Sequence, residues 1–125
     1  MSRRFLIWHI PDGLARGGTD SQGPVFYADR DYSPAAFRLY ARLAPASGDL
    51  TVDIRDDGVT IFAGNYATLN KSVNLEEQAE DYADIHPVIE DGSVISFHII
   101  DKAGAEGITG QLELESLDDE DDAGE

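Results

Sequence analysis

The feature that most constrains this chain is a series of short, strand-like segments separated by turn signals. Asp57-Gly58 and Asp91-Gly92 are turn dipeptides that stand between such segments. Several short strands with this spacing predict an all-β fold, an antiparallel β-sandwich of the jelly-roll kind. The expected strands cover residues 5–10, 25–29, 36–44, 49–56, 59–62, 94–101 and 107–115.

Segment 36–44 has the clearest strand pattern, because apolar and other residues alternate along it. A helix is the competing interpretation, since alanine, leucine and arginine all favour one. The flanking prolines, Pro34 and Pro45, favour the strand. One face of this strand is then apolar, and the other carries Arg38, Tyr40 and Arg42.

The chain divides into three expected regions. Residues 1–23 form an N-terminal strand and arm, residues 24–115 form the β-sandwich, and the like-charge run in 116–125 predicts a disordered acidic tail. Residues 64–73 are expected to be a long loop. Residues 74–84 predict one short helix or an irregular crossover, with Asn74 as a candidate helix cap.

Length and composition limit the class of protein. A chain of 125 residues forms one domain, and the absence of cysteine excludes disulfides and thiolate metal sites. No apolar run approaches the roughly 18–20 residues that a membrane-spanning helix needs, so we expect no membrane span. The apolar stretch 5–10 superficially resembles a signal peptide, but Pro11 and Asp12 close it, and we interpret it as a first strand.

The net charge of −16 is unevenly distributed along the chain. Residues 1–42 contain six arginines against four acids, whereas residues 113–125 contain eight acids and no base. A strongly acidic protein repels nucleic acid, so direct binding of DNA or RNA is not expected. The N-terminal third is the natural place for an acidic partner to dock.

No catalytic or metal-binding pattern stands out, so we expect no enzyme activity, no cofactor and no metal. The three histidines, His9, His86 and His98, are far apart and lack the paired spacing of metal ligands. A Gly-x-Ser-x-Gly motif, a phosphate-binding loop and an EF-hand loop are all absent. Several aspartates could still supply oxygen ligands to a structural calcium ion: Asp29, Asp31, Asp53, Asp56 and Asp57.

Four residues are candidates for a protein interface. Arg38 and Arg42 flank Tyr40 on one strand face, and interfaces are enriched in arginine and aromatic residues. The alternative is a solvated sheet face with cross-strand ion pairs to Asp53 or Glu113. Trp8, the single tryptophan, is a candidate for either a core residue or a subunit-interface anchor. Segment 5–10 alternates only loosely, so it is expected to be buried on both faces or to pack against a neighbouring subunit.

Four stretches carry a resemblance to a known group of proteins: DYSPAAFRLYAR at 31–42, GDLTVDIRDDGVTIF at 48–62, EDGSVIS at 90–96 and GQLELE at 110–115. Together they resemble small virion proteins of tailed bacteriophages, over roughly residues 24–115. The shared motifs are mainly strand and turn sequences, and they imply no catalytic residue.

The resemblance implies a structural role in the virion. The first expectation is a capsid decoration, or cement, protein that assembles in the host cytoplasm. It would bind the major capsid protein or other virion proteins on the outer shell as a homo-oligomer, with a trimer favoured, and residues 1–23 would supply docking surface. The alternatives are a tail-fibre or tail-adaptor module and a carbohydrate-binding module. The last needs a row of exposed aromatics, and the tyrosines are scattered: Tyr27, Tyr32, Tyr40 and Tyr66.

Overall fold

A computed structural model describes residues 3–18, 20–63, 66–77, 82 and 86–117. The described residues form nine strands, and the predicted all-β fold is confirmed. The strands are β1 (Arg3–Ile10), β2 (Phe26–Tyr27), β3 (Tyr32–Leu43), β4 (Leu50–Asp56), β5 (Val59–Thr60), β6 (Ala67–Leu69), β7 (Leu75–Glu77), β8 (Val94–Asp101) and β9 (Glu106–Ser116).

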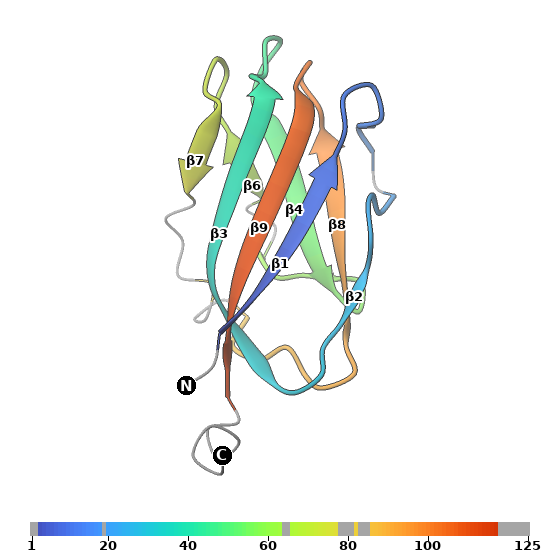
Figure 1. The fold of residues 1–125 in the computed structure, drawn as a ribbon, viewed down its shortest axis with the longest axis vertical. Coiled ribbons are helices and arrows are strands. Elements are labelled where there is room, and N and C mark those ends of the chain that lie inside the picture. The colour runs from blue at the N-terminus through green and yellow to red at the C-terminus, as the bar shows by residue number, and fades with distance from the viewer. Residues whose placement is uncertain (1–2, 19, 64–65, 78–81, 83–85, 118–125) are drawn as a thin grey trace.

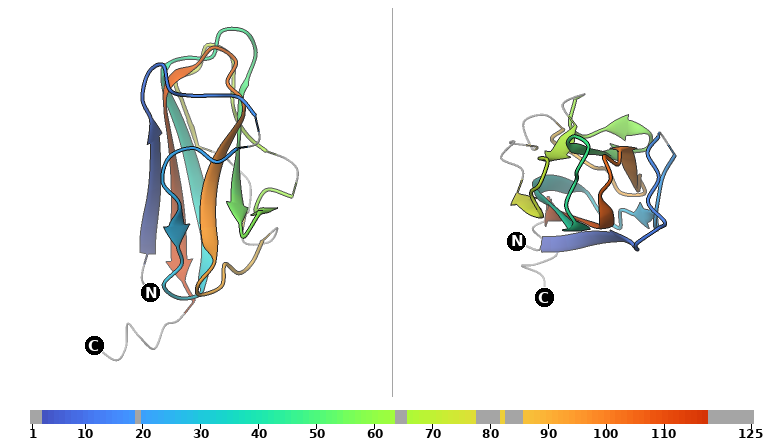
Figure 2. Two further views of the ribbon diagram at one scale, coloured as in Figure 1. Left: turned by 90° about the vertical axis from the view of Figure 1, so that its right-hand side faces the viewer. Right: turned by 90° about the horizontal axis from the view of Figure 1, so that it is seen from above.

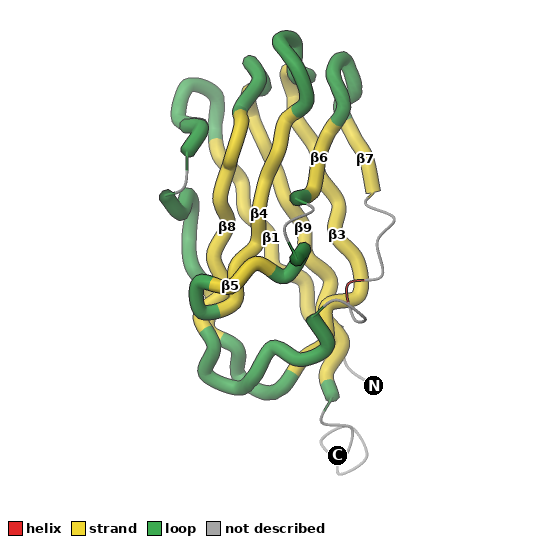
Figure 3. Tube along the Cα trace, turned by 180° about the vertical axis from the view of Figure 1, so that it is seen from behind, coloured by secondary structure: helices red, strands yellow, loops and turns green. Residues whose placement is uncertain are grey.

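Two antiparallel sheets pack face to face (Figures 1 and 2). One sheet has the order β1-β9-β3-β7, and the other has the order β2-β8-β4-β5 with β6 also paired to β4. Both β5 and β6 pair with β4, β5 with residues 55–56 and β6 with residues 50–52. Figure 3, seen from behind, shows β6 beside β4 on the side away from β8. If β5 and β6 are counted as one interrupted strand, the order is that of an eight-stranded jelly roll.

The N-terminal strand is part of the sandwich and not a separate arm. All eight residues of β1 pair with β9, from Arg3 opposite Glu115 to Ile10 opposite Ile108. Leu6, Trp8 and Ile10 alternate with exposed residues and point into the core, so β1 closes one side of it. The strand expected in residues 1–23 is β1, and it pairs with the sandwich along its full length.

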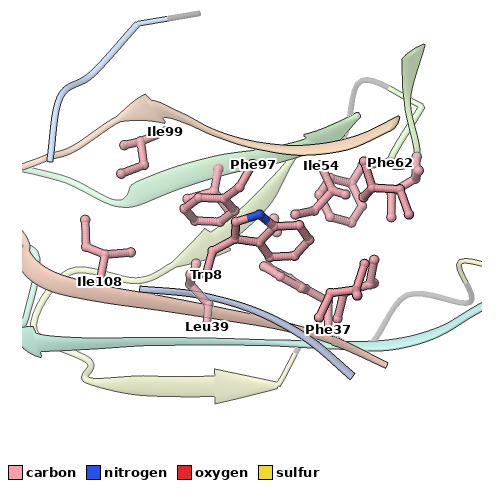
Figure 4. Packing of buried hydrophobic residues seen from close by; sticks show 14 of the residues in the cluster. Trp8, Phe37, Leu39, Ile54, Phe62, Phe97, Ile99 and Ile108 are labelled. Atoms are coloured by element: carbon pink, nitrogen blue, oxygen red, sulfur yellow. The ribbon is translucent and has the colours of Figure 1, made fainter. Parts of the chain in front are cut away.

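Aromatic rings from both sheets fill the centre of the core (Figure 4). The ring of Trp8 stacks on Phe97 of the opposite sheet, with centroids 5.6 Å apart. Phe62 lies between Phe37 and Tyr82, at centroid distances of 5.8 and 5.1 Å. The apolar face predicted from the alternation in 36–44 contributes Phe37 and the neighbouring inward residues of β3 to this core.

Gly110 of β9 makes room for two of these rings. It sits between Trp8 of β1 and Leu39 of β3 in the sheet. A Cβ atom at this position would lie 2.8 Å from Phe97 Cε1 and 3.1 Å from Phe37 Cζ. The missing side chain is thus a packing requirement, because rings from both layers occupy its space.

The helix predicted over 74–84 is wrong at its beginning, where Leu75–Glu77 forms β7 and pairs with β3. Asn74 does not cap a helix. Its Nδ2 donates to the carbonyls of Ala41, at 2.8 Å, and Arg42, at 3.1 Å. The chain is thereby held against the edge of β3, where an extended backbone can form ladder hydrogen bonds.

The remainder of that predicted helix falls mostly outside the described residues, which omit 78–81 and 83–85. Of the residues near these gaps, Tyr82 accepts a hydrogen bond at its carbonyl from the N–H of His86 at 2.8 Å. The predicted acidic tail lies outside the described residues from 118 onward, whereas Ser116 is still part of β9.

Two further segments differ from the prediction. The expected loop 64–73 contains β6, which pairs with residues 50–52 of β4. The expected strand 59–62 is extended only at β5, because Ile61 and Phe62 turn inward and become buried core residues. Over so few residues, the alternation of apolar and polar residues predicts a strand only weakly. The burial of Ile61 and Phe62 in the core determines the path of the chain here.

Tyr32 is the first residue of β3, and its side chain is tied to the loop before the strand. Its buried hydroxyl donates to the Asp29 carboxylate, which also receives Nη1 of Arg4 at 2.9 Å. The hydrogen bond from Tyr32 lowers the pKa of Asp29, and the Arg4 charge adds to this effect. Burial, together with the bond to Asp29, raises the pKa of Tyr32.

Replacing Tyr32 with phenylalanine is expected to raise the pKa of Asp29 and to lower the free energy of unfolding by less than about 1 kcal/mol at neutral pH. The loss is small because the Asp29 side chain is 58% exposed and solvent screens its charge. A carboxyl whose pKa is depressed in the folded state stabilises the fold above its unfolded pKa of about 3.9, and this stabilisation is lost as the pH falls through the folded value.

The difference in free energy of unfolding between wild type and Tyr32→Phe should therefore be largest near pH 7 and decrease below about pH 4. An NMR titration of the Asp29 carboxyl and urea unfolding at both pH values would measure the two effects. A Tyr32→Phe variant with an unchanged Asp29 pKa would show that the hydroxyl does not control this carboxylate.

Candidate protein-binding face

The predicted pattern of Arg38, Tyr40 and Arg42 is confirmed in β3. All three side chains alternate with buried residues and lie on the solvent side of the sheet β1-β9-β3-β7. Tyr40 remains 41% exposed, although it lies within a paired strand. The structure therefore brings these three predicted interface residues together on one surface.

Trp8, the fourth predicted interface residue, lies elsewhere. Its side chain is 0% exposed, and its indole Nε1 donates to the carbonyl of Pro24 at 2.8 Å. Phe26 meets the indole edge to face, with ring centroids 5.3 Å apart. Phe97 stacks on the same indole (Figure 4). The core interpretation of Trp8 is confirmed, and the side chain has no surface to offer a partner.

The sheet's solvent side carries an apolar group that extends well beyond Tyr40. Phe5 is 47% exposed, Ile7 is 51% exposed and Leu75 is 63% exposed. These residues come from β1 and β7, the two edge strands of the sheet. We call this surface the outer face; its members are Arg3, Phe5, Ile7, His9, Arg38, Tyr40, Arg42, Leu75, Thr109, Gln111 and Glu113.

Strand register places the members of the outer face in adjacent rows. One row runs from His9 through Thr109 and Tyr40 to Leu75. The neighbouring row contains Ile7, Gln111 and Arg38. Neighbouring strands lie about 4.8 Å apart, so these rows form one continuous surface.

Ion pairs hold the arginines of the outer face in place. The carboxylate of Glu113, only 9% exposed, binds Arg3 on one side and Arg38 on the other. Arg42 pairs with Asp12 at 2.5 Å, and this hydrogen bond raises the pKa of the guanidinium. The expected cross-strand pair from β3 to Glu113 is confirmed. Exposed pairs of this kind stabilise the fold little, but they fix long side chains in an orientation that a partner can meet.

The sequence analysis expected segment 5–10 to be buried on both faces or to pack against a neighbouring subunit, but it did not assign Phe5 and Ile7 to an exposed face, for a physical reason. Phe5 and Ile7 point outward, whereas Leu6 and Trp8 point inward, yet all four are apolar. A period of two cannot assign faces when both faces are apolar. The loose alternation of segment 5–10 was the signal that both faces of this strand are apolar. An edge strand that is apolar on both faces can pack on the core with one face and bind a partner with the other.

The solvent side of the other sheet carries a polar cluster. Asp53 is fully buried, and its carboxylate accepts hydrogen bonds from Arg55 Nε, at 2.8 Å, and from the Thr60 hydroxyl. His98 is opposite Asp53 in the register and bonds Ser96 Oγ through Nε2 at 2.8 Å. Serine, histidine and aspartate are the residue types of a hydrolase triad. The hydrogen bonds to Arg55 and Thr60, however, show that the Asp53 carboxylate connects β4 to β5. We therefore do not interpret the cluster as a catalytic site.

The three histidines are in different places. His9 bonds Thr109 on the outer face, His98 bonds Ser96 on the opposite sheet, and His86 bonds Asp56 at 2.8 Å. Across the described parts of the chain, no three His, Asp or Glu side chains are grouped so that they could hold a metal ion.

The tyrosines considered for sugar binding are not in one row. Tyr32 is buried, Tyr27 lies in β2 of one sheet, and Tyr40 lies in β3 of the other. An aromatic platform of these three residues therefore does not form.

Within the described residues, no helix has both the length and the apolar character to cross a membrane. No protein-family model matches this chain, and a search of curated proteins found no match either.

Proposed function

We propose that the protein is a non-enzymatic structural protein of a phage virion that serves as a capsid decoration protein. The observation that carries this proposal is the outer face. Exposed aromatic and aliphatic side chains beside ordered arginines, on a rigid sheet, form the type of surface that binds another protein. The jelly-roll strand order adds a fold-level analogy, because viral capsid domains use the same fold.

In this role the protein binds the outer surface of the shell, with the major capsid protein as its partner. Each copy adds buried apolar area across the joints between capsid subunits, which stiffens the shell. Assembly as a trimer presents several outer faces at once, so that individually weak contacts combine into stable attachment.

The proposal is tested by the copy number of the protein in purified particles. Affinity capture of the tagged protein from its native source, with quantitative mass spectrometry, should recover the major capsid protein in a fixed and comparable ratio. Recovery with tail proteins at a few copies per particle would favour the tail-module alternative. Recovery with neither would rule out the virion assignment and direct attention to glycan arrays.

Replacing Ile7 with aspartate is expected to reduce binding to capsids at least about tenfold, equivalent to about 1.4 kcal/mol or more. The change places a charge beside Phe5 among the exposed apolar side chains of β1, where a partner would have to desolvate it. Binding can be measured by co-sedimentation with shells that lack the protein.

Val59→Asp is the matched control, because Val59 is similarly exposed, at 59%, but lies in β5 of the other sheet. Both variants should unfold at temperatures close to that of wild type. Equal loss of binding in the two variants, or loss in Val59→Asp alone, would contradict docking through the outer face.

A further inference from the structure

The strand β1 has one unpaired edge along its whole length. It is the terminal strand of its sheet, and β9 occupies its other edge. In an antiparallel pair, every second residue directs its N–H and C=O away from the partner. Within the described residues, no backbone group outside β9 bonds to the backbone of β1. An eight-residue edge of this kind is a template for a further strand.

A hollow of about 280 Å³ adjoins the C-terminal end of this edge. It is lined by both His9 and Ile10, which point to opposite faces of β1, so it lies beside the strand and not on either face. Gly23 also lines the hollow and packs against β1, because a Cβ there would lie 3.3 Å from Ile10 Cδ1. The remaining lining residues are Pro11, Leu14, Arg16 and Gln22.

The far wall of the hollow is held in place by hydrogen bonds. The Gln22 side chain binds both backbone groups of Arg16, accepting from its N–H at 2.9 Å and donating to its carbonyl. The N–H of Gln22 donates to the carbonyl of Phe97 in β8 at 2.8 Å. The N–H of Leu14 donates to the carbonyl of Pro11 at 3.1 Å and closes a turn. The hollow therefore exists before any ligand arrives.

The side chains at the hollow specify the chemistry of an occupant. Ile10 and the exposed Leu14 offer apolar contact. The Arg16 guanidinium bonds the carbonyl of Gly13 at 3.4 Å and, within the described part of the chain, pairs with no carboxylate. In a protein of net charge −16, this is a cationic group without an acidic partner.

We propose that the free edge of β1 and the adjoining hollow bind an extended, acidic peptide segment of a partner protein. The segment adds as a fifth strand beside β1, with main-chain hydrogen bonds providing affinity. One apolar side chain enters the hollow against Ile10 and Leu14, and a carboxylate of the segment pairs with Arg16. This site adjoins the outer face, with which it shares His9, and it does not depend on the virion assignment.

The test uses the purified full chain and a displayed library of random twelve-residue peptides as the probe. Selection should enrich peptides that combine Asp or Glu with apolar residues. NMR spectra of the protein with one such synthetic peptide should show shifts concentrated in β1 and in residues 11–23. Arg16→Glu should weaken binding of that peptide at least tenfold, and Leu14→Asp should abolish it, while Val59→Asp leaves it unchanged. Arg16 and Leu14 are both exposed, so these variants should remain folded.

Three outcomes would overturn the proposal. The first is a failure to enrich any peptide relative to selection on the Leu14→Asp variant. The second is a bound peptide whose NMR shifts lie on another surface. The third is concentration-dependent dimerisation with protection of the β1 amides, which would show that a second copy of the chain occupies the edge.

Discussion

Replacing Trp8 with alanine is expected to lower the free energy of unfolding by about 3–5 kcal/mol. The side chain is fully buried, stacks on Phe97, meets Phe26 edge to face, and donates a hydrogen bond to Pro24. Alanine removes all of these contacts and leaves a cavity between the two sheets. Since small domains are stable by only about 5–15 kcal/mol, this single change removes a large part of the stability. Chemical denaturation followed by far-UV circular dichroism would measure it.

Trp8→Phe separates the ring packing from the hydrogen bond. Phenylalanine keeps an aromatic ring beside Phe97 but loses the donor to Pro24, so we expect a smaller loss, of about 1–2 kcal/mol. Light scattering at several protein concentrations would show whether either variant self-associates differently from wild type. If Trp8→Ala weakened association while leaving the stability of the monomer unchanged, Trp8 would be an interface anchor and its core placement would be wrong.

Replacing Gly110 is expected to have the second-largest effect, by overfilling the core. Gly110→Ala should cost about 2 kcal/mol and Gly110→Val about 3 kcal/mol or more, because the new atoms would displace Phe97 and Phe37. These rings cannot retreat easily, since Trp8 and Phe62 pack against them. Thermal and urea unfolding of both variants would give the order and the size of the losses.

Gln111→Val is the matched control for this prediction. It places the same β-branched residue one position further along β9, where the side chain points to the solvent side. Its stability should change by less than about 0.5 kcal/mol. Equal effects at positions 110 and 111 would mean that valine disturbs the strand itself and that the ring contacts of Gly110 are not the cause.

Most of the sandwich could be predicted because its long strands obey simple alternation. In β3 the inward Phe37 and Leu39 alternate with Arg38 and Tyr40, and burial follows the pattern. The segments expected at 49–56, 94–101 and 107–115 are also strands, namely β4, β8 and β9. The face that carries Arg38, Tyr40 and Arg42 was predictable for the same reason, since a correct period of two also assigns the outward residues.

What could not be predicted depends on contacts between distant parts of the chain. Asn74 is a good helix cap by itself, but its side chain binds the backbone of β3, and the chain continues as a strand. Gly110 gives no sequence signal, because its role follows from rings contributed by β3 and β8. Phe5 and Ile7 could not be assigned to a face until β9 fixed the register of β1.

The pairing of β1 with β9 also determines when this protein can fold. The two strands are separated by about a hundred residues in sequence, and β9 is the sole sheet neighbour of β1 among the described residues. During synthesis, β1 therefore remains unpaired, with its apolar side chains exposed, until β9 has emerged from the ribosome. Non-local pairing of this kind slows folding, and the waiting segment is a natural target for chaperones. A released fragment that ends before Glu106 is expected to remain sensitive to protease throughout β1, and one that extends past Ser116 is expected to be resistant.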